Sequence, residues 1–310
     1  MCFKFKTKWS QKNQRPRDAW EKTLKARAFN YVRASTLMEA LDAFDAAGGD
    51  ASYVAGGQSL VPALALRLQA PQVLIDIAHI PDLRGIELQG DWLRIGALTR
   101  HAEALADPMI RKHAPLYSEA APHVAHPAIR NKGTLGGSIS HADPASEFPA
   151  MTLALGAELE IANRDGTRRV PADEFFLDLF QTAIEPGELL VAIHVPIVRP
   201  GHRWAFHEFA RRRGDFALVG CGILAEFAGD VVEQIRIAFF SIGNTPLRAP
   251  RAEEVLIGQK LDQTSIAAAQ AVIADDLDPP DDENVPQEMR RHLARVLLGR
   301  LLGQIARQTP

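Results

Sequence analysis

The feature of this sequence that most constrains its fold is a pair of short glycine clusters, each followed by a helix-like segment. The first lies in "SYVAGGQSLVPALALRLQAP" (residues 52–71) and the second in "HPAIRNKGTLGGSISHADPASEFPA" (residues 126–150). Neither contains G-x-x-x-x-G-K-[ST] or a G-x-G-x-x-G between a strand and a helix. Glycines nevertheless let main-chain N–H groups converge on an anion, and a nearby helix start adds a favourable dipole. Taken alone, the first cluster is more typical of an ordinary strand-to-helix turn.

The second cluster changes this interpretation. The segment "TLGGS" (residues 134–138) offers hydroxyl groups and bare main-chain amides, and Asp143 and Glu147 follow it. Two loops of this kind suit a diphosphate held between them. Glu147 falls in the first turn of a predicted helix, where a carboxylate can accept both hydroxyls of a ribose, as in dinucleotide folds. The pair of clusters therefore predicts a dinucleotide site, although the spacing does not say which dinucleotide.

Composition indicates an ordinary globular protein. The 310 residues are 46% hydrophobic and 24% charged, with 35 basic and 38 acidic side chains and a net charge of −3. That balance implies no polyanion-binding surface, so nucleic acid is not an expected partner. No apolar run is long enough to span a membrane. The two cysteines exclude a disulfide framework and a Cys-rich metal or iron–sulfur site, and we expect a cytoplasmic protein.

The first 27 residues differ from the rest of the chain. They are rich in Lys, Arg and Gln and poor in aliphatic side chains, and they lack the apolar stretch of a secretory signal. We expect residues 1–27 to be a basic, disordered leader. A basic arm that binds a partner is the alternative.

The remaining pattern predicts an α+β protein. Residues 28–198 are expected to form a two-part domain, with a small β-α-β-α-β unit that carries the first glycine cluster and a larger mixed part. In the larger part, "AELEIANRDGTRRVPA" predicts a hairpin that turns at Asp165-Gly166. Residues 199–310 are expected to form an antiparallel sheet followed by helices, with the boundary near residues 196–200.

Four motifs together resemble a known family: "AGGQSL", "RNKGTLGGSISHADPASE", "ARRRGDFALVG" and "SIGNTPLRA". They are similar to the FAD-binding medium subunits of the molybdenum hydroxylases, and most of all to the carbon monoxide dehydrogenase branch, which is related to the FAD domain of xanthine dehydrogenase. The resemblance runs from about Ala28 to Gln308. It implies a two-part FAD-binding domain followed by a C-terminal medium-subunit domain.

The resemblance also implies which residues bind FAD. Two loops would hold the diphosphate, Glu147 the ribose and Val124 a wall of the adenine pocket. His141, Asp143 and two leucines would lie near the isoalloxazine ring, where His207 stands in place of a flavin-proximal lysine of the xanthine dehydrogenase relatives. The full set is Ala55, Gly56, Gly57, Gln58, Ser59, Leu60, Val124, Thr134, Leu135, Gly136, Gly137, Ser138, His141, Asp143, Glu147, Leu189, Leu190 and His207.

The function implied by the resemblance is electron transfer within a larger enzyme. A large molybdenum-cofactor subunit would hydroxylate the substrate, and a small subunit would relay electrons through [2Fe–2S] clusters to the FAD of this chain. The external acceptor would be NAD, a quinone or oxygen. Two alternatives remain: a self-contained flavin oxidase of the vanillyl-alcohol type, and a nucleotide-binding module without redox activity.

Four other features have less specific interpretations. His123 and His126 have no third ligand in the sequence around them, so a metal site there is not expected. Residues 211–213, three consecutive arginines, favour a local anionic partner or a subunit interface. Ser59 is not in a G-x-S-x-G elbow, and Cys221 is expected to be an inert buried thiol.

Overall fold

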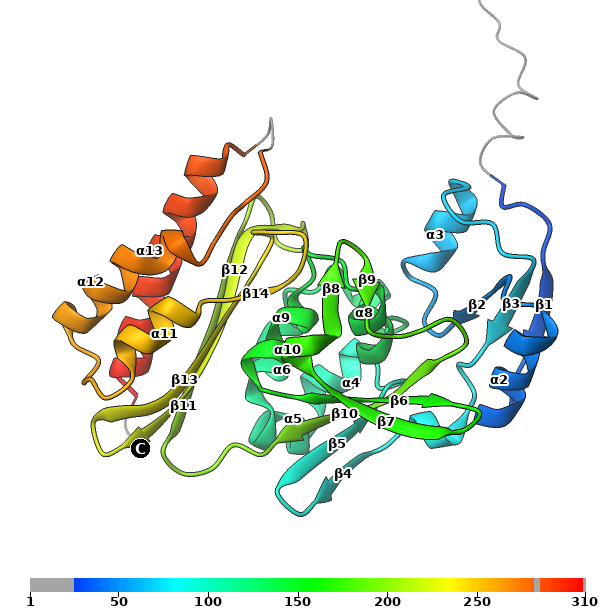
Figure 1. Cartoon of the computed structure of the whole chain (residues 1–310), viewed down its shortest axis with the longest axis horizontal. Helices are drawn as coiled ribbons and strands as arrows, with labels where there is room; N and C mark the ends of the chain where they lie inside the picture. The colour runs from blue at the N-terminus through cyan, green and yellow to red at the C-terminus, as the bar shows by residue number, and fades with distance from the viewer. Residues whose placement is uncertain (1–24, 282–284, 309–310) are drawn as a thin grey trace, which may run out of the picture.

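A computed structural model describes residues 25–281 and 285–308. Three units lie side by side along its long axis: a small N-terminal unit, a central unit and a C-terminal unit (Figure 1). Residues 1–24, which make up most of the predicted leader, lie outside the described residues. Across the described ranges, no helix has the length and apolarity needed to cross a membrane.

The small unit is the predicted β-α-β-α-β arrangement. Its three strands are parallel and run in the order β1-β3-β2. The helix α2 begins after Thr36, whose hydroxyl accepts a hydrogen bond from the amide of Glu39 at 3.1 Å. The elements are β1 (Asn30–Arg33), α2 (Leu37–Ala46), β2 (Ala51–Val54), α3 (Leu60–Ala65) and β3 (Val73–Asp76).

The central unit is built on a five-stranded antiparallel sheet in the order β4-β5-β10-β6-β7. Its strands are β4 (Ile86–Gln89), β5 (Trp92–Gly96), β6 (Glu158–Asn163), β7 (Gly166–Pro171) and β10 (Leu189–Pro196), with a separate hairpin of β8 (Phe176–Asp178) and β9 (Gln181–Thr182). The predicted turn at Asp165-Gly166 joins β6 to β7.

Short helices cover one face of this sheet. Proline opens several of them, because it is favourable in the first turn of a helix and unfavourable further in. They are α4 (His101–Ala106), α5 (Pro108–His113), α6 (Pro115–Ala120), α7 (Pro127–Arg130), α8 (Leu135–His141), α9 (Glu147–Ala154) and α10 (Ala172–Phe175), with a 3-10 turn, η1 (Pro81–Leu83), before β4.

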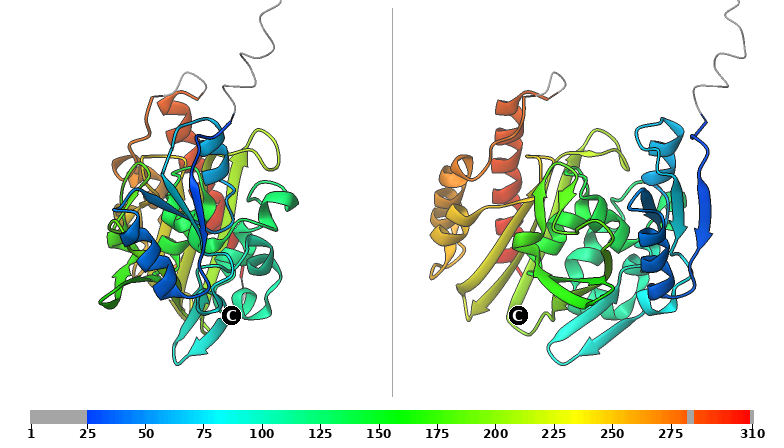
Figure 2. Two further views of the ribbon diagram at one scale, coloured as in Figure 1. Left: turned by 90° about the vertical axis from the view of Figure 1, so that its right-hand side faces the viewer. Right: turned by 45° about the vertical axis from the view of Figure 1, so that its right-hand side comes forward.

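The C-terminal unit has the predicted antiparallel sheet, in the order β11-β12-β13-β14. One face of the sheet packs against α11–α13, and the other packs against α6 and α9 of the central unit (Figures 1 and 2). Cys221 is fully buried on the α13 side. The elements are β11 (His202–Ala210), β12 (Ala217–Ala228), β13 (Val231–Phe240), β14 (Leu247–Arg248), α11 (Pro250–Leu256), α12 (Gln263–Val272), η2 (Ile273–Asp275) and α13 (Gln287–Ala306). The predicted α+β class is confirmed.

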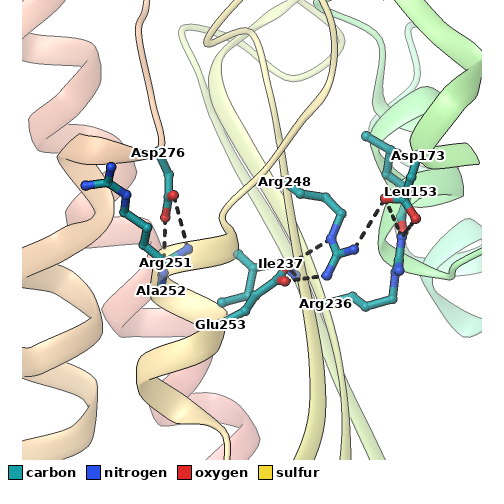
Figure 3. Close-up of polar contacts among 9 residues, drawn as sticks. All are labelled: Leu153, Asp173, Arg236, Ile237, Arg248, Arg251, Ala252, Glu253 and Asp276. Atoms are coloured by element: carbon teal, nitrogen blue, oxygen red, sulfur yellow. Dashed lines mark hydrogen bonds and ion pairs between the residues drawn. The ribbon is translucent and has the colours of Figure 1, made fainter.

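An arginine–carboxylate network joins the central and C-terminal units (Figure 3). Arg236 donates to both oxygens of Asp173, at 2.8 and 2.7 Å, and to the carbonyl of Leu153 at 2.8 Å. Arg248 lies between Asp173, at 3.3 Å, and Glu253, to which it is also hydrogen-bonded. Burial alone would raise the pKa of Asp173, but the two arginines outweigh this effect and lower it. The network fixes the C-terminal sheet against α9 and α10.

Candidate functional site

A cavity of about 650 Å³ lies where the small unit meets the central unit and reaches the turn between β11 and β12. Its size is within the range of small-molecule and cofactor sites. Every residue of the predicted FAD-binding set lines it except Leu135 and His207. Residues more than 130 positions apart in the sequence, such as Ala55 and Leu190, therefore share one cavity.

The first glycine loop supplies unpaired main-chain donors. It follows the end of β2 at Val54 and leads into α3 at Leu60. Gly57 has a φ of +69°, a left-handed conformation that favours glycine. Within the described part of the chain, the amides of residues 56–60 donate to no protein acceptor. Successive free amides in such a turn make an anion-binding concavity.

Gly56 brings the two glycine clusters together. A Cβ atom added at Gly56 would lie 2.2 Å from the carbonyl oxygen of Lys132 and 2.8 Å from the Cα of Gly133. The first loop therefore packs directly on the backbone that leads into the second loop. Only glycine allows this approach, so Gly56 serves loop–loop packing.

Most amides of the second glycine loop already donate to protein acceptors, which corrects the expectation from the sequence that they are bare. The amide of Leu135 donates to Thr99 O at 2.8 Å, and that of Gly136 donates to Ala97 O at 2.9 Å. The amide of Gly137 donates to the hydroxyl of Thr134 at 3.1 Å. A Cβ atom at Gly136 would lie 2.5 Å from the Cβ of Ala97. Gly136 lets α8 approach the end of β5.

The second loop therefore offers mainly hydroxyl groups to a ligand, because the amides of residues 135–138 already donate to protein acceptors. Thr134 and Ser138 both line the cavity. The Thr134 hydroxyl already accepts a hydrogen bond from Gly137, and its own hydrogen is free to donate to an anion. Leu135 is fully buried in the core of the central unit.

His101, which was not among the predicted site residues, holds the second loop in place. Its amide donates to Gly133 O at 3.0 Å, and its Nε2 lies 2.9 Å from Thr134 O. Because a carbonyl can only accept, Nε2 carries the hydrogen. Burial lowers the pKa of His101 to about 4, so the ring is neutral at pH 7. A lone histidine at a helix start carries no signal of this role in the sequence.

Glu147 presents a buried carboxyl group to the cavity. The residue is 9% exposed and opens α9. Burial raises its pKa to about 8, with smaller contributions from the charges of Glu208 and Asp143. Its carboxyl group has no side-chain partner among the described residues. The carboxyl group accepts a hydrogen bond from its own main-chain amide. Hydroxyl donors from a ligand would use its remaining acceptor capacity.

The remaining predicted residues form other parts of the wall. His141, at the end of α8, lies against Phe180 of the β8–β9 hairpin with ring centroids 5.0 Å apart. Asp143 accepts from the amide of Ala145 at 2.9 Å, which shapes the loop between α8 and α9. Leu189 and Leu190 come from β10, and Val124 comes from the loop after α6.

The β11–β12 turn also reaches the cavity, through Gly214, Asp215 and Phe216. Gly214 has a φ of +89°, and an added Cβ atom would lie 2.8 Å from Cε1 of His126. Phe216 is 69% exposed. The motif "ARRRGDFALVG" contains these residues, but none of them was predicted to lie at the site.

The structure places His207 outside the cavity. Neighbouring side chains of a strand point to opposite faces. Phe206 packs in the core shared with the central unit, so His207 points toward α13 and has its ring 5.7 Å from that of Phe209. Burial lowers the pKa of His207, and the nearby His123 lowers it further. The carboxyl group on the cavity side of β11 is Glu208, 3.1 Å from Nδ1 of His123.

The other candidate features have structural contacts. His123 interacts with Glu208, and His126 packs against Gly214. Among residues 25–281 and 285–308 no group of three metal-ligating side chains comes together. Burial raises the pKa of the Cys221 thiol well above its ordinary value, which makes it unreactive.

Comparison with known proteins gives two family matches that cover most of the chain. Residues 27–198 match the family described as "FAD binding domain in molybdopterin dehydrogenase". Residues 204–305 match the family described as "CO dehydrogenase flavoprotein C-terminal domain".

Individual relatives and a solved structure agree with these matches. The chain is 38% identical over 282 residues to subunit alpha of the 6-hydroxypseudooxynicotine dehydrogenase complex of Paenarthrobacter nicotinovorans, covering 91% of this chain and 95% of the relative. It is 36% identical to the carbon monoxide dehydrogenase medium chain of Hydrogenophaga pseudoflava, covering 89% of this chain and 96% of the relative. A solved structure of carbon monoxide dehydrogenase from Hydrogenophaga pseudoflava, in a form that lacks the Mo-pyranopterin moiety, superimposes with a TM-score of 0.88 at 35% identity. The match covers 90% of this chain and 98% of the chain in that structure.

Proposed function

The chain belongs to the FAD-binding family of the molybdopterin dehydrogenases, and from this premise we propose that it is the electron-transferring medium subunit of a molybdenum hydroxylase. In this role it receives electrons from a small [2Fe–2S] subunit, which takes them from a large molybdenum-cofactor subunit. It then passes them to an external acceptor such as NAD, a quinone or oxygen.

The observation that carries the proposal is the complementary donor set around one cavity. The free amides of residues 56–60 and the hydroxyls of Thr134 and Ser138 suit the two phosphates of FAD. The carboxyl group of Glu147 suits the adenosine ribose hydroxyls, and the apolar wall of Leu189 and Leu190 suits the isoalloxazine ring. Bound FAD would supply the redox chemistry, because it can accept two electrons and release them again.

The residues of this chain then bind and orient the cofactor. No described side chain of the cavity is arranged as a nucleophile with an adjacent base, and electron transfer needs none. The chain has only two cysteines, too few for the four-thiolate ligand set of a [2Fe–2S] cluster. This cysteine count supports the assignment of the iron–sulfur clusters to a different subunit.

The purified chain provides the test. After incubation with FAD and gel filtration, we expect a yellow protein with a flavin-to-protein ratio near one. Anaerobic addition of the reduced [2Fe–2S] subunit should bleach the flavin, whereas a small organic substrate alone should not. A colourless protein that takes up no FAD would contradict the proposal. Bleaching by a small substrate alone would instead favour a self-contained flavin oxidase.

A further inference from the structure

The cavity wall is assembled from two units, and one tyrosine connects them. Tyr53 lies in β2 of the small unit, just before the first glycine loop. Its hydroxyl donates to the carbonyl oxygen of Gly187 at 3.1 Å. Gly187 lies two residues before β10, which carries Leu189 and Leu190 of the wall. One hydrogen bond therefore joins the strand that carries the loop to the strand that carries the leucines.

Packing holds this hydroxyl in position. The ring of Tyr53 stacks on Phe44 of α2, with centroids 5.5 Å apart and ring planes at 24°. Gly187 has a φ of +90°, and an added Cβ atom would lie 3.3 Å from Cδ1 of Phe44, so glycine is needed at this contact. Burial raises the pKa of Tyr53 above its ordinary value, so the phenol keeps its proton and remains a donor.

A second set of polar contacts between these two units is more exposed. Arg164, in the β6–β7 turn, pairs with Asp42 at 3.1 Å and Asp45 at 2.9 Å. All three side chains are about half exposed, so salt screens these pairs and their contribution is small. The half-buried hydrogen bond of Tyr53 is less sensitive to salt.

We propose that Tyr53 is a positioning residue of the FAD site, whose hydroxyl holds the first glycine loop at the correct distance from the wall formed by Leu189 and Leu190. This inference rests on the proposed function. A ligand that contacts both units binds only those protein molecules in which the two units have the correct spacing. Its apparent affinity is therefore proportional to the fraction of protein molecules with that spacing. Loss of the hydroxyl lowers that fraction and accelerates release of the ligand.

The test compares two tyrosine-to-phenylalanine variants of the full chain. Tyr53→Phe removes the hydroxyl that crosses between the units and keeps the ring. Tyr31→Phe is the matched control, because the Tyr31 hydroxyl bonds to Asp76 within the same small sheet. FAD affinity is measured by quenching of flavin fluorescence, and FAD release by dilution, both at low salt and at about 1 M NaCl, where surface pairs are screened. The melting temperature of each apoprotein is recorded.

We expect Tyr53→Phe to bind FAD about two- to tenfold more weakly than the wild type, with faster release, and the difference to be larger at high salt. Tyr31→Phe should bind like the wild type. Equal affinity of Tyr53→Phe and the wild type at both salt concentrations would overturn the inference, as would equal weakening in the two variants. Failure of the wild type itself to bind FAD would overturn the proposed function instead.

Discussion

Replacing Gly56 by alanine is predicted to push the two glycine loops apart and release the flavin. The added methyl group would lie 2.2 Å from the carbonyl oxygen of Lys132 and 2.8 Å from the Cα of Gly133, and both of these are backbone atoms that cannot rotate away. The loops must therefore separate by about 1 Å, and overpacking of this kind costs about 1–3 kcal/mol. The displaced loop carries the free amides of residues 56–60, so FAD should lose its diphosphate contacts.

The assay pairs this variant with Gly48→Ala in the same unit. Gly48 has a φ of +63° and no atom within 4 Å of an added Cβ atom. Alanine there should cost about 1–2 kcal/mol through backbone strain alone. Flavin-to-protein ratio and thermal unfolding are measured for both. We expect both variants to melt earlier and only Gly56→Ala to lose FAD. Full flavin occupancy in Gly56→Ala would refute the reasoning.

Three further predictions follow from the charged groups. Glu147→Gln should weaken FAD binding by about 1.5–3 kcal/mol in a binding titration, because it removes charge-assisted hydrogen bonds. Asp165→Asn, at an exposed turn, should leave FAD affinity unchanged, and equal affinities of the two variants would contradict the ribose assignment. Because its pKa is raised to about 8, Glu147 is protonated at pH 7 in the protein without FAD, whereas bound FAD favours the carboxylate. FAD binding should therefore release a proton, and FAD affinity should increase from pH 6 to about 8. An affinity that does not change with pH would count against this linkage. Asp173→Asn should lower the free energy of unfolding by about 1 kcal/mol in denaturant unfolding, and by more at low salt than at high salt, since the network of Figure 3 is partly exposed. FAD should stay bound, because the network lies outside the cavity. A loss of flavin would show that the network also shapes the site.

Much of the architecture could be predicted from local patterns. The Thr36 cap, the Asp165-Gly166 turn and the strand-rich C-terminal region carry signals within a few residues of the elements that they define. The family resemblance seen in the four motifs is confirmed by the family matches. The two glycine clusters also predicted one shared site, because two loops of this kind suit a diphosphate held between them, and both clusters line one cavity.

The sequence could not show how each glycine is used. Gly136 packs on Ala97, and its amide is paired with the carbonyl of that residue. These partners are set by tertiary packing, and nothing near Gly136 in the sequence distinguishes it from Gly57. The same limit applies to His101 and Tyr53, whose roles depend on contacts with carbonyl groups far along the chain. His207 was assigned to the site only because it stands where the xanthine dehydrogenase relatives have a lysine. The alternation of side chains along β11 turns it to the face of the sheet that packs on α13.

The most direct test of the central claim is a crystal structure of the purified chain with FAD. We predict that the diphosphate lies against the amides of residues 56–60, with oxygens about 2.7–3.2 Å from their nitrogens, and that the adenosine ribose hydroxyls bind the carboxylate of Glu147. FAD bound elsewhere, or bound here with its diphosphate away from the first glycine loop, would contradict it.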